Sequence, residues 1–138
     1  MSRLDLQDDQ MCYACGSKNT AGLRLHFRHP QKYLLTSNVV FKKRHQGYKD
    51  IVHGGLVATV LDEMMVNLCW KEKMPAVTAE LTVRLKKPAK VGQKIFLEGR
   101  ISKEKGRAIY ASANARTETG ELLAEANAVC IRIPAVVN

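Results

Sequence analysis

The sequence predicts an α+β fold in which one long helix packs against one face of an antiparallel sheet. The segment Leu56–Trp70 is largely apolar and contains neither Gly nor Pro, which is typical of a buried helix. Strand-like segments precede it, and four more follow it consecutively. This grouping favours an antiparallel sheet, because a parallel βαβ fold needs more helices.

The chain before the helix predicts an arm followed by strands. Residues 1–22 are irregular, Leu23–Arg28 predicts a short strand, and Tyr33–Lys43, rich in Leu, Val and Phe, predicts a longer one. A polar loop, His45–Asp50, then leads to the helix. No repeat or low-complexity linker divides the sequence, so we expect a single domain over residues 1–138.

After Pro75 the hydrophobic period changes from about 3.6 to 2. Val77–Lys86 therefore predicts a half-buried strand, with Thr78 and Glu80 on its polar face. Pro88–Gly92 is expected to turn the chain. The remaining strands are predicted at Lys94–Lys103, Arg107–Thr117 and Glu121–Ile133. The last segment also has good helix propensity, but its place after a hairpin favours a strand.

Composition and charge limit the classes of function. No apolar run reaches the about 18–20 residues that span a bilayer, and the polar, acidic N-terminus predicts no secretory signal. The net charge of +9 predicts an acidic partner: nucleic acid, a membrane surface or a phosphorylated small molecule. An aromatic content of 6% argues against nucleic acid. The bases are concentrated between Lys18 and Lys49 and between Arg84 and Arg107.

The cysteines predict reduced thiols and no bound metal. Cys12 and Cys15 form a Cys-x-x-Cys pair, but no second ligand pair stands at the short spacing of a zinc site. A metal completed by His26 or His29 is the minor alternative. The other two cysteines, Cys69 and Cys130, lie singly in apolar segments and are expected to pack in the core of a cytoplasmic protein.

Asp62 is the helix residue that most needs a functional explanation. At 100° per residue it projects among Ala58, Met65, Val66 and Cys69, away from the polar stripe that contains Glu63. An unpaired buried carboxylate is costly and has a raised pKa, so its presence is typical of a catalytic base or nucleophile. Pairing with a base or a structural cap is the alternative. Glu63 is expected to be solvated or ion-paired.

His53-Gly54-Gly55 stands where the helix begins. Glycines let a substrate approach the backbone closely, and the unpaired N–H groups of a helix N-terminus suit a developing oxyanion. Asp62 lies about two turns, or about 12 Å, along the axis from Gly54. A site that uses both residues therefore has to be completed by a second subunit.

These residues resemble a known motif. His53-Gly54-Gly55-Leu56 followed by Asp62, with Pro88-Ala89-Lys90-Val91-Gly92 downstream, resembles the hotdog-fold acyl-CoA thioesterases, specifically the phenylacetyl-CoA and Them-type branch of the 4-hydroxybenzoyl-CoA thioesterase superfamily. Cys12-Tyr13-Ala14-Cys15-Gly16 is similar to the N-terminal arm of many bacterial members. The resemblance covers essentially the whole chain. It implies a long central helix wrapped by a curved antiparallel sheet, in a homodimer or a tetramer of two dimers.

The resemblance also implies residue roles in thioester hydrolysis. The Gly54 backbone N–H, with Gly55, polarises the thioester carbonyl, and the partner subunit's Asp62 acts as general base or as nucleophile. Thr78 matches the Ser/Thr that orients the water or the carboxylate. His53 shapes the turn, with a general-base role as second choice.

Two further sets of residues follow from the resemblance. Gln46 is the candidate for the Asn or Gln whose amide contacts the thioester oxygen in relatives. Coenzyme A is part of the substrate rather than a separate cofactor, and the candidates for its phosphates are Arg84, Lys86, Lys90 and Arg107. The alternative functions are a non-catalytic acyl-CoA-binding or regulatory protein, and a hotdog dehydratase or hydratase that pairs His53 with Asp62.

Overall fold

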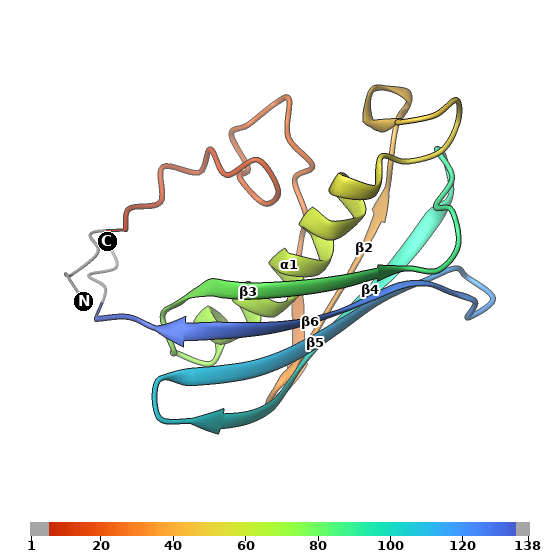
Figure 1. Ribbon diagram of the computed structural model, residues 1–138. Coiled ribbons are helices and arrows are strands. Elements are labelled where there is room, and N and C mark those ends of the chain that lie inside the picture. The colour runs from red at the N-terminus through yellow and green to blue at the C-terminus, as the bar shows by residue number, and fades with distance from the viewer. Residues whose placement is uncertain (1–5, 135–138) are drawn as a thin grey trace.

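A computed structural model describes residues 6–134 and shows one helix lying across a six-stranded antiparallel sheet (Figure 1). The first five residues of the expected arm and the last four of the expected domain lie outside the described residues. The helix α1 spans Gly54–Lys71. The strands are β1 Arg28–Gln31, β2 Leu34–Val40, β3 Ala76–Leu85, β4 Lys94–Lys105, β5 Ala108–Arg116 and β6 Leu122–Arg132. The order across the sheet is β1-β2-β4-β5-β6-β3.

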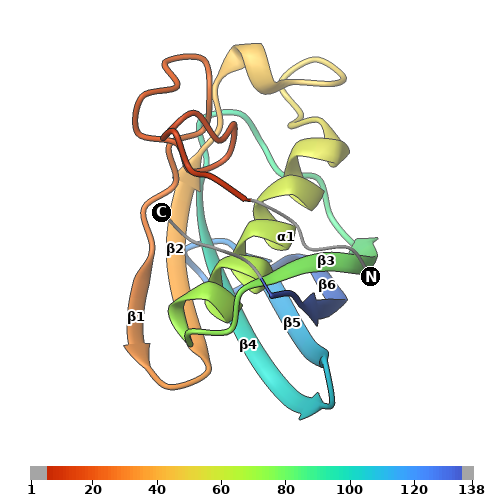
Figure 2. The ribbon, with the colours of Figure 1, turned by 90° about the vertical axis from the view of Figure 1, so that its left-hand side faces the viewer.

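The helix confirms the sequence prediction and lies within the curve of the sheet (Figure 2). Its buried side chains are those of the broad apolar face: Val57, Val60, Leu61, Met64, Met65, Leu68 and Cys69. No helix in residues 6–134 is long and apolar enough to cross a membrane. The apolar surface of α1 is instead covered by the sheet on one side and partly by the N-terminal arm on the other.

The strand predictions after the helix are confirmed, including the strand nature of the last segment. The short strand expected over Leu23–Arg28 is wrong, because β1 begins only at Arg28. The reason lies in the arm: the N–H groups of Leu23 and Leu25 donate to the carbonyls of Tyr13 and Ala14, at 2.8 and 2.9 Å. These bonds hold the segment against the arm and keep it out of the sheet.

Strand β3 lies at the edge of the sheet and carries a bulge. Thr78 is opposite Cys130 on β6, but Glu80 is opposite the adjacent Val129, so Ala79 is an extra residue. Thr78 therefore faces the helix with Ala76, whereas Glu80 points to the outer face. The expected single apolar face of this strand is wrong before the bulge. It holds after it, where Leu81, Val83 and Leu85 are opposite buried alanines of β6.

Small residues set a short distance between the helix and the sheet. A Cβ added to Gly99 on β4 would lie 2.4 Å from the backbone oxygen of Met64, so the helix backbone rests directly on this strand. Three alanines on β5 and three on β6 are buried and directly opposite one another: Ala111, Ala113, Ala115, Ala124, Ala126 and Ala128. Their methyl groups leave room for the larger side chains of α1.

Candidate active site

The helix begins with one backbone amide free and the next one occupied. His53 is the N-cap, and its Nδ1 accepts the N–H of Gly55 at 2.9 Å. The carbonyl of His53 accepts the N–H groups of Leu56 and Val57. Within the described residues the Gly54 N–H has no protein partner. Of the two glycine amides named from the sequence, only that of Gly54 is available to a ligand, and the neutral His53 ring carries its proton on Nε2.

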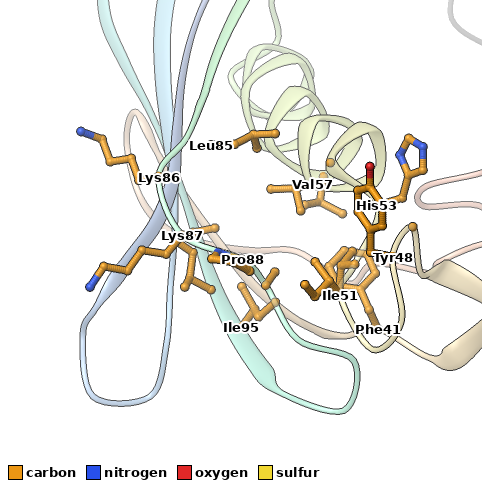
Figure 3. Close-up of a pocket in the computed structure, with 17 residues that line it drawn as sticks. Phe41, Tyr48, Ile51, His53, Val57, Leu85, Lys86, Lys87, Pro88 and Ile95 are labelled. Atoms are coloured by element: carbon orange, nitrogen blue, oxygen red, sulfur yellow. The ribbon is translucent and has the colours of Figure 1, made fainter.

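A cavity of about 630 Å³ opens beside Gly54 (Figure 3). Its walls are mostly apolar and come from the loop before α1, the first turns of α1 and the segment after β3. They include Phe41, Tyr48, Ile51, Val57, Val60, Leu85, Pro88 and Ile95. Lys86 and Lys87 are the basic residues of this lining, and their side chains point away from the apolar walls. The cavity therefore suits an apolar chain that carries negative charge at one end.

Asp62 has a partner, contrary to the expectation of an unpaired buried carboxylate. It is half-buried, and the hydroxyl of Thr78 donates to its Oδ1 at 2.7 Å. The bulge of β3 makes this contact possible, because it turns Thr78 toward the helix. Cys130 lies opposite Thr78 in the sheet. The carboxylate is thus held in a fixed orientation at the sheet edge rather than enclosed.

The same bulge separates Glu80 from this pair. Glu80 is exposed on the outer face, where it lines a shallow depression with Thr82 and Asn127. The expectation that Thr78 and Glu80 share a strand face is therefore wrong. Its physical reason is the extra residue, which breaks the alternation between them.

Gln46 is folded into its own loop. Its Oε1 accepts the N–H of Asp50 at 3.0 Å, and its backbone pairs with Val52. Gln46 does not line the cavity beside Gly54. Sequence reasoning missed Tyr48, which lines that cavity next to His53 and is 87% exposed. An aromatic residue in a polar loop directly before His-Gly-Gly is the signal that could have found it.

The four predicted phosphate-binding residues do not lie together. Arg84 and Lys86 share Glu125, at 3.8 and 3.5 Å, beside the cavity. Lys90 is exposed in the turn that follows, outside the cavity lining.

Arg107 lies at the other end of the sheet, where its guanidinium donates to the carbonyl of Arg132 at 3.1 Å. Along β6, the partner of Ala108 is Ile131 and the partner of Leu85 is Ala124, which are about 23 Å apart. A single subunit therefore does not bring Arg107 and Lys86 to one nucleotide site.

The N-terminal arm covers Glu63, which was expected to be solvated or ion-paired. Glu63 is half-buried, and Asn67 Nδ2 donates to its carboxylate at 2.6 Å. Burial raises the pKa of Glu63. Burial and hydrogen bonds to Cys12 and Glu63 also raise the pKa of Cys15. The ligand atoms of Cys12, Cys15 and Glu63 lie within 4.8 Å of one another.

The two histidines considered as metal ligands are not part of this cluster. His29 instead pairs with Glu72 at 2.6 Å. The core prediction for Cys69 and Cys130 is confirmed, since both are fully buried free thiols. A hydrogen bond to Cys130, together with burial, raises the pKa of Cys69.

Comparison with known proteins gives a family match over residues 49–124, to the thioesterase superfamily. Mouse acyl-coenzyme A thioesterase 13 is 28% identical over 99 residues, which cover 70% of this chain and 69% of the relative. Mouse acyl-coenzyme A thioesterase THEM4 is 29% identical over 89 residues, and the match spans 64% of this chain but only 38% of that protein.

Solved structures share the fold at lower identity. The thioesterase superfamily protein RHA08564 matches with a TM-score of 0.84 at 20% identity, over 88% of this chain and 60% of that one. Streptococcus mutans smu.793, solved with acetyl CoA bound, matches with a TM-score of 0.74 at 16% identity, over 78% and 87%. The E. coli PaaI protein matches with a TM-score of 0.75 at 12% identity, over 80% and 84%.

Proposed function

Because the chain belongs to the thioesterase superfamily and has its hotdog fold, we propose that it hydrolyses the thioester of an acyl- or aryl-coenzyme A. The observation that carries the proposal is the free Gly54 amide at the start of α1, opening into an apolar cavity, with an oriented carboxylate further along the same helix. The curated relatives named acyl-coenzyme A thioesterases support the choice of substrate.

The Gly54 amide supplies the electrophilic side of the reaction. An oxygen of the thioester carbonyl placed at the helix N-terminus accepts the Gly54 N–H and lies at the positive end of the helix dipole. As the carbonyl carbon is attacked, this oxygen gains negative charge, and the interaction strengthens. The His53 cap holds the first turn in place while leaving this one amide unused.

Asp62 supplies the general base or the nucleophile of the reaction. The Thr78 hydroxyl holds Oδ1, so Oδ2 is the atom that meets the substrate. As a general base, Asp62 takes a proton from water while the water oxygen bonds to the carbonyl carbon. The carbon–sulfur bond then breaks, and coenzyme A leaves as the thiol after taking up the proton. As a nucleophile, Asp62 bonds to the carbonyl carbon while the carbon–sulfur bond breaks and coenzyme A leaves as the thiolate. Water then hydrolyses the resulting anhydride, its proton passes to the thiolate, and the Asp62 carboxylate is restored.

The separation between these two groups calls for a second subunit. Gly54 and Asp62 are about 12 Å apart along the helix axis, too far to act on one carbonyl group. Strand β3 is an edge strand with Leu81 and Leu85 exposed, at 38% and 57%. We expect two copies to join along this edge, so that the Gly54 of one copy meets the partner's Asp62.

The phosphates of coenzyme A are expected at the mouth of the cavity. Lys86 and Lys87 stand there with exposed side chains, paired with the half-buried Glu125 at 3.5 Å and the exposed Glu121 at 3.0 Å. Such exposed pairs are weak and exchange readily for a phosphate. Arg107 would reach the same nucleotide only from another subunit, because it lies at the opposite end of its own sheet.

The test is hydrolysis of an acyl- and aryl-CoA panel, with the released thiol detected, for the wild type and for Asp62→Asn. We expect cleavage of at least one thioester and its loss in the variant. Tight binding of acyl-CoA with no thiol release would support the non-catalytic binding protein instead. Addition of water to an enoyl-CoA without thiol release would support the hydratase.

A further inference from the structure

The described residues contain a second cluster of functional side chains, which can bind a metal ion, on the side of α1 that the sheet leaves open. We propose that Cys12, Cys15 and Glu63 bind a thiophilic divalent metal ion, Zn²⁺ above all, which fastens the N-terminal arm to the helix. Two thiolates and a carboxylate are ligands that Zn²⁺ takes in proteins. The inference stands on this cluster alone and does not depend on the proposed thioesterase activity.

The two thiols are presented by a loop that is tied at several points. The bonds run from Gly16 N–H to the Cys12 carbonyl at 2.8 Å, from Lys18 N–H to the Gln10 carbonyl at 3.0 Å, and from Asn19 Nδ2 to the Met11 carbonyl at 3.1 Å. Ala14, between the cysteines, is 2% exposed. Both cysteines are therefore fixed by the backbone before a metal arrives, which lowers the ordering cost of binding.

The geometry lies close to that of a zinc site. With Zn–S bonds of about 2.3 Å, two sulfur atoms of a tetrahedral site lie about 3.8 Å apart. The three ligand atoms here lie within 4.8 Å of one another, so a closing movement of about 1 Å brings them into range. Cys12 is exposed, so the fourth position faces solvent and is filled by water.

Exchange of the two thiol protons for the metal ion leaves the local net charge unchanged. Binding forms two Zn–S bonds and one Zn–O bond and releases the two thiol protons, so the divalent cation replaces two unit charges. The net charge around Glu63 is then unchanged, and the adjacent Asp62 meets no new field at long range. The Cys15 sulfur and a Glu63 carboxylate oxygen already lie within 4.8 Å of each other. A cation bound between them can therefore have both atoms as ligands.

The experiment is a Co²⁺ titration of the reduced protein under anaerobic conditions. We expect the strong visible bands of tetrahedral Co²⁺, a thiolate-to-cobalt charge-transfer band in the near ultraviolet, and loss of both when Zn²⁺ is added. Cys12→Ser removes one exposed sulfur without disturbing the core, and should weaken binding at least about 10–100-fold and reduce the charge-transfer band. Glu63→Gln should weaken binding and shift the visible bands.

Cys69→Ala is the matched control, since it removes a thiol that lies outside the cluster and should leave the Co²⁺ spectrum unchanged. Circular dichroism of each variant checks that the fold is retained. A Co²⁺ spectrum without a charge-transfer band, or one that Cys12→Ser does not alter, would overturn the proposal. An unaltered spectrum in Glu63→Gln would remove Glu63 from the site, and a Cys12–Cys15 disulfide that survives reduction would replace the metal.

Discussion

At the start of α1 the proposed reactive group is a backbone amide, whereas eight residues further along the same helix it is a carboxylate. The amide of Gly54 is positioned by the loop before the helix and opens into a cavity. The carboxylate of Asp62 is positioned by a strand, through Thr78. The first depends on local backbone geometry, and the second depends on pairing between β3 and β6, which are far apart in sequence.

This difference decides how each group responds to mutation. A side chain can be replaced by one of the same shape without its chemistry, but a backbone amide can only be obstructed or displaced. The carboxylate is therefore tested by removing it, and the amide by crowding it. Substitutions at the two positions should also differ in how they affect kcat and KM.

The largest effect is expected from Asp62→Asn. The amide keeps the shape of the side chain but neither accepts a proton nor attacks a carbonyl carbon, so kcat should fall about 10²–10⁴-fold with little change in KM. Steady-state kinetics on the best substrate of the panel measures it. Glu80→Gln, which removes a carboxylate from the outer face of the same sheet edge, should leave kcat unchanged. Full activity in Asp62→Asn would contradict the assignment.

Gly54→Ala should have the next largest effect. The added methyl would lie 2.8 Å from Cδ1 of Leu85, so it narrows the cavity and displaces the substrate carbonyl from the amide. A shift of about 1 Å can cost about 10²-fold in kcat. The double variant Gly54→Ala/Leu85→Ala restores the space and should recover part of the loss. No recovery would indicate that crowding is not the cause.

A smaller loss is expected from Thr78→Ala. The variant removes one hydrogen bond to Asp62, worth about 1 kcal/mol, which corresponds to about a fivefold fall in kcat. Thr78→Ser keeps the hydroxyl and should retain most of the activity. Thr82→Ala provides the control on the outer face of the same strand. Equal kinetics for Thr78→Ala and Thr82→Ala would show that the contact has no catalytic use.

Substitutions at the mouth of the cavity should raise KM and leave kcat unchanged. Lys86→Gln with Lys87→Gln removes two positive charges near the expected phosphates, so KM for acyl-CoA should rise about threefold to tenfold with kcat unchanged. An acyl thioester that lacks the nucleotide should show no change, and added salt should reduce the difference. The matched control is Lys103→Gln with Lys105→Gln, which removes two positive charges at the end of β4 that lies away from the cavity.

The smallest effect concerns pH and the loop before the helix. His45 is 4% exposed, and burial lowers its pKa. A buried histidine of lowered pKa stabilises the fold above the pKa of the unfolded chain, and this stability is lost as the pH falls below that value. Tm should fall by no more than about 5 °C between pH 7 and pH 5.5. His45→Asn should flatten this dependence in thermal unfolding followed by circular dichroism.

Most elements could be predicted because their signals are local. The Leu56–Trp70 helix and the strands after it follow from hydrophobic period, and Asp62 stood out because it projects from an apolar helix face. The bulge could not be predicted, since the alternation from Val77 to Leu85 runs through it without a break. Only the pairing with β6 reveals that Thr78 faces the helix and Glu80 does not.

The errors at Glu63 and Arg107 have a different cause. Glu63 lies on the polar stripe of the helix, but an irregular arm covers it, and irregular segments give no periodic signal of where they pack. Arg107 lies far from Lys86 because the long strand β4 runs between them and carries the chain to the opposite end of the sheet. Placing either residue requires knowledge of contacts between distant segments.

The close approach of the helix to Gly99 and the facing alanines has a consequence for how the family can diversify. The clearance between α1 and the sheet sets how far Asp62 projects toward the sheet edge, and it is adjusted by single methyl groups. Exchanging one of these alanines for a larger residue would lift the helix and carry Gly54 and Asp62 with it as one rigid unit. The small residues beneath the helix therefore set the positions of the Gly54 amide and the Asp62 carboxylate, and substitutions among them can shift both groups without replacing either.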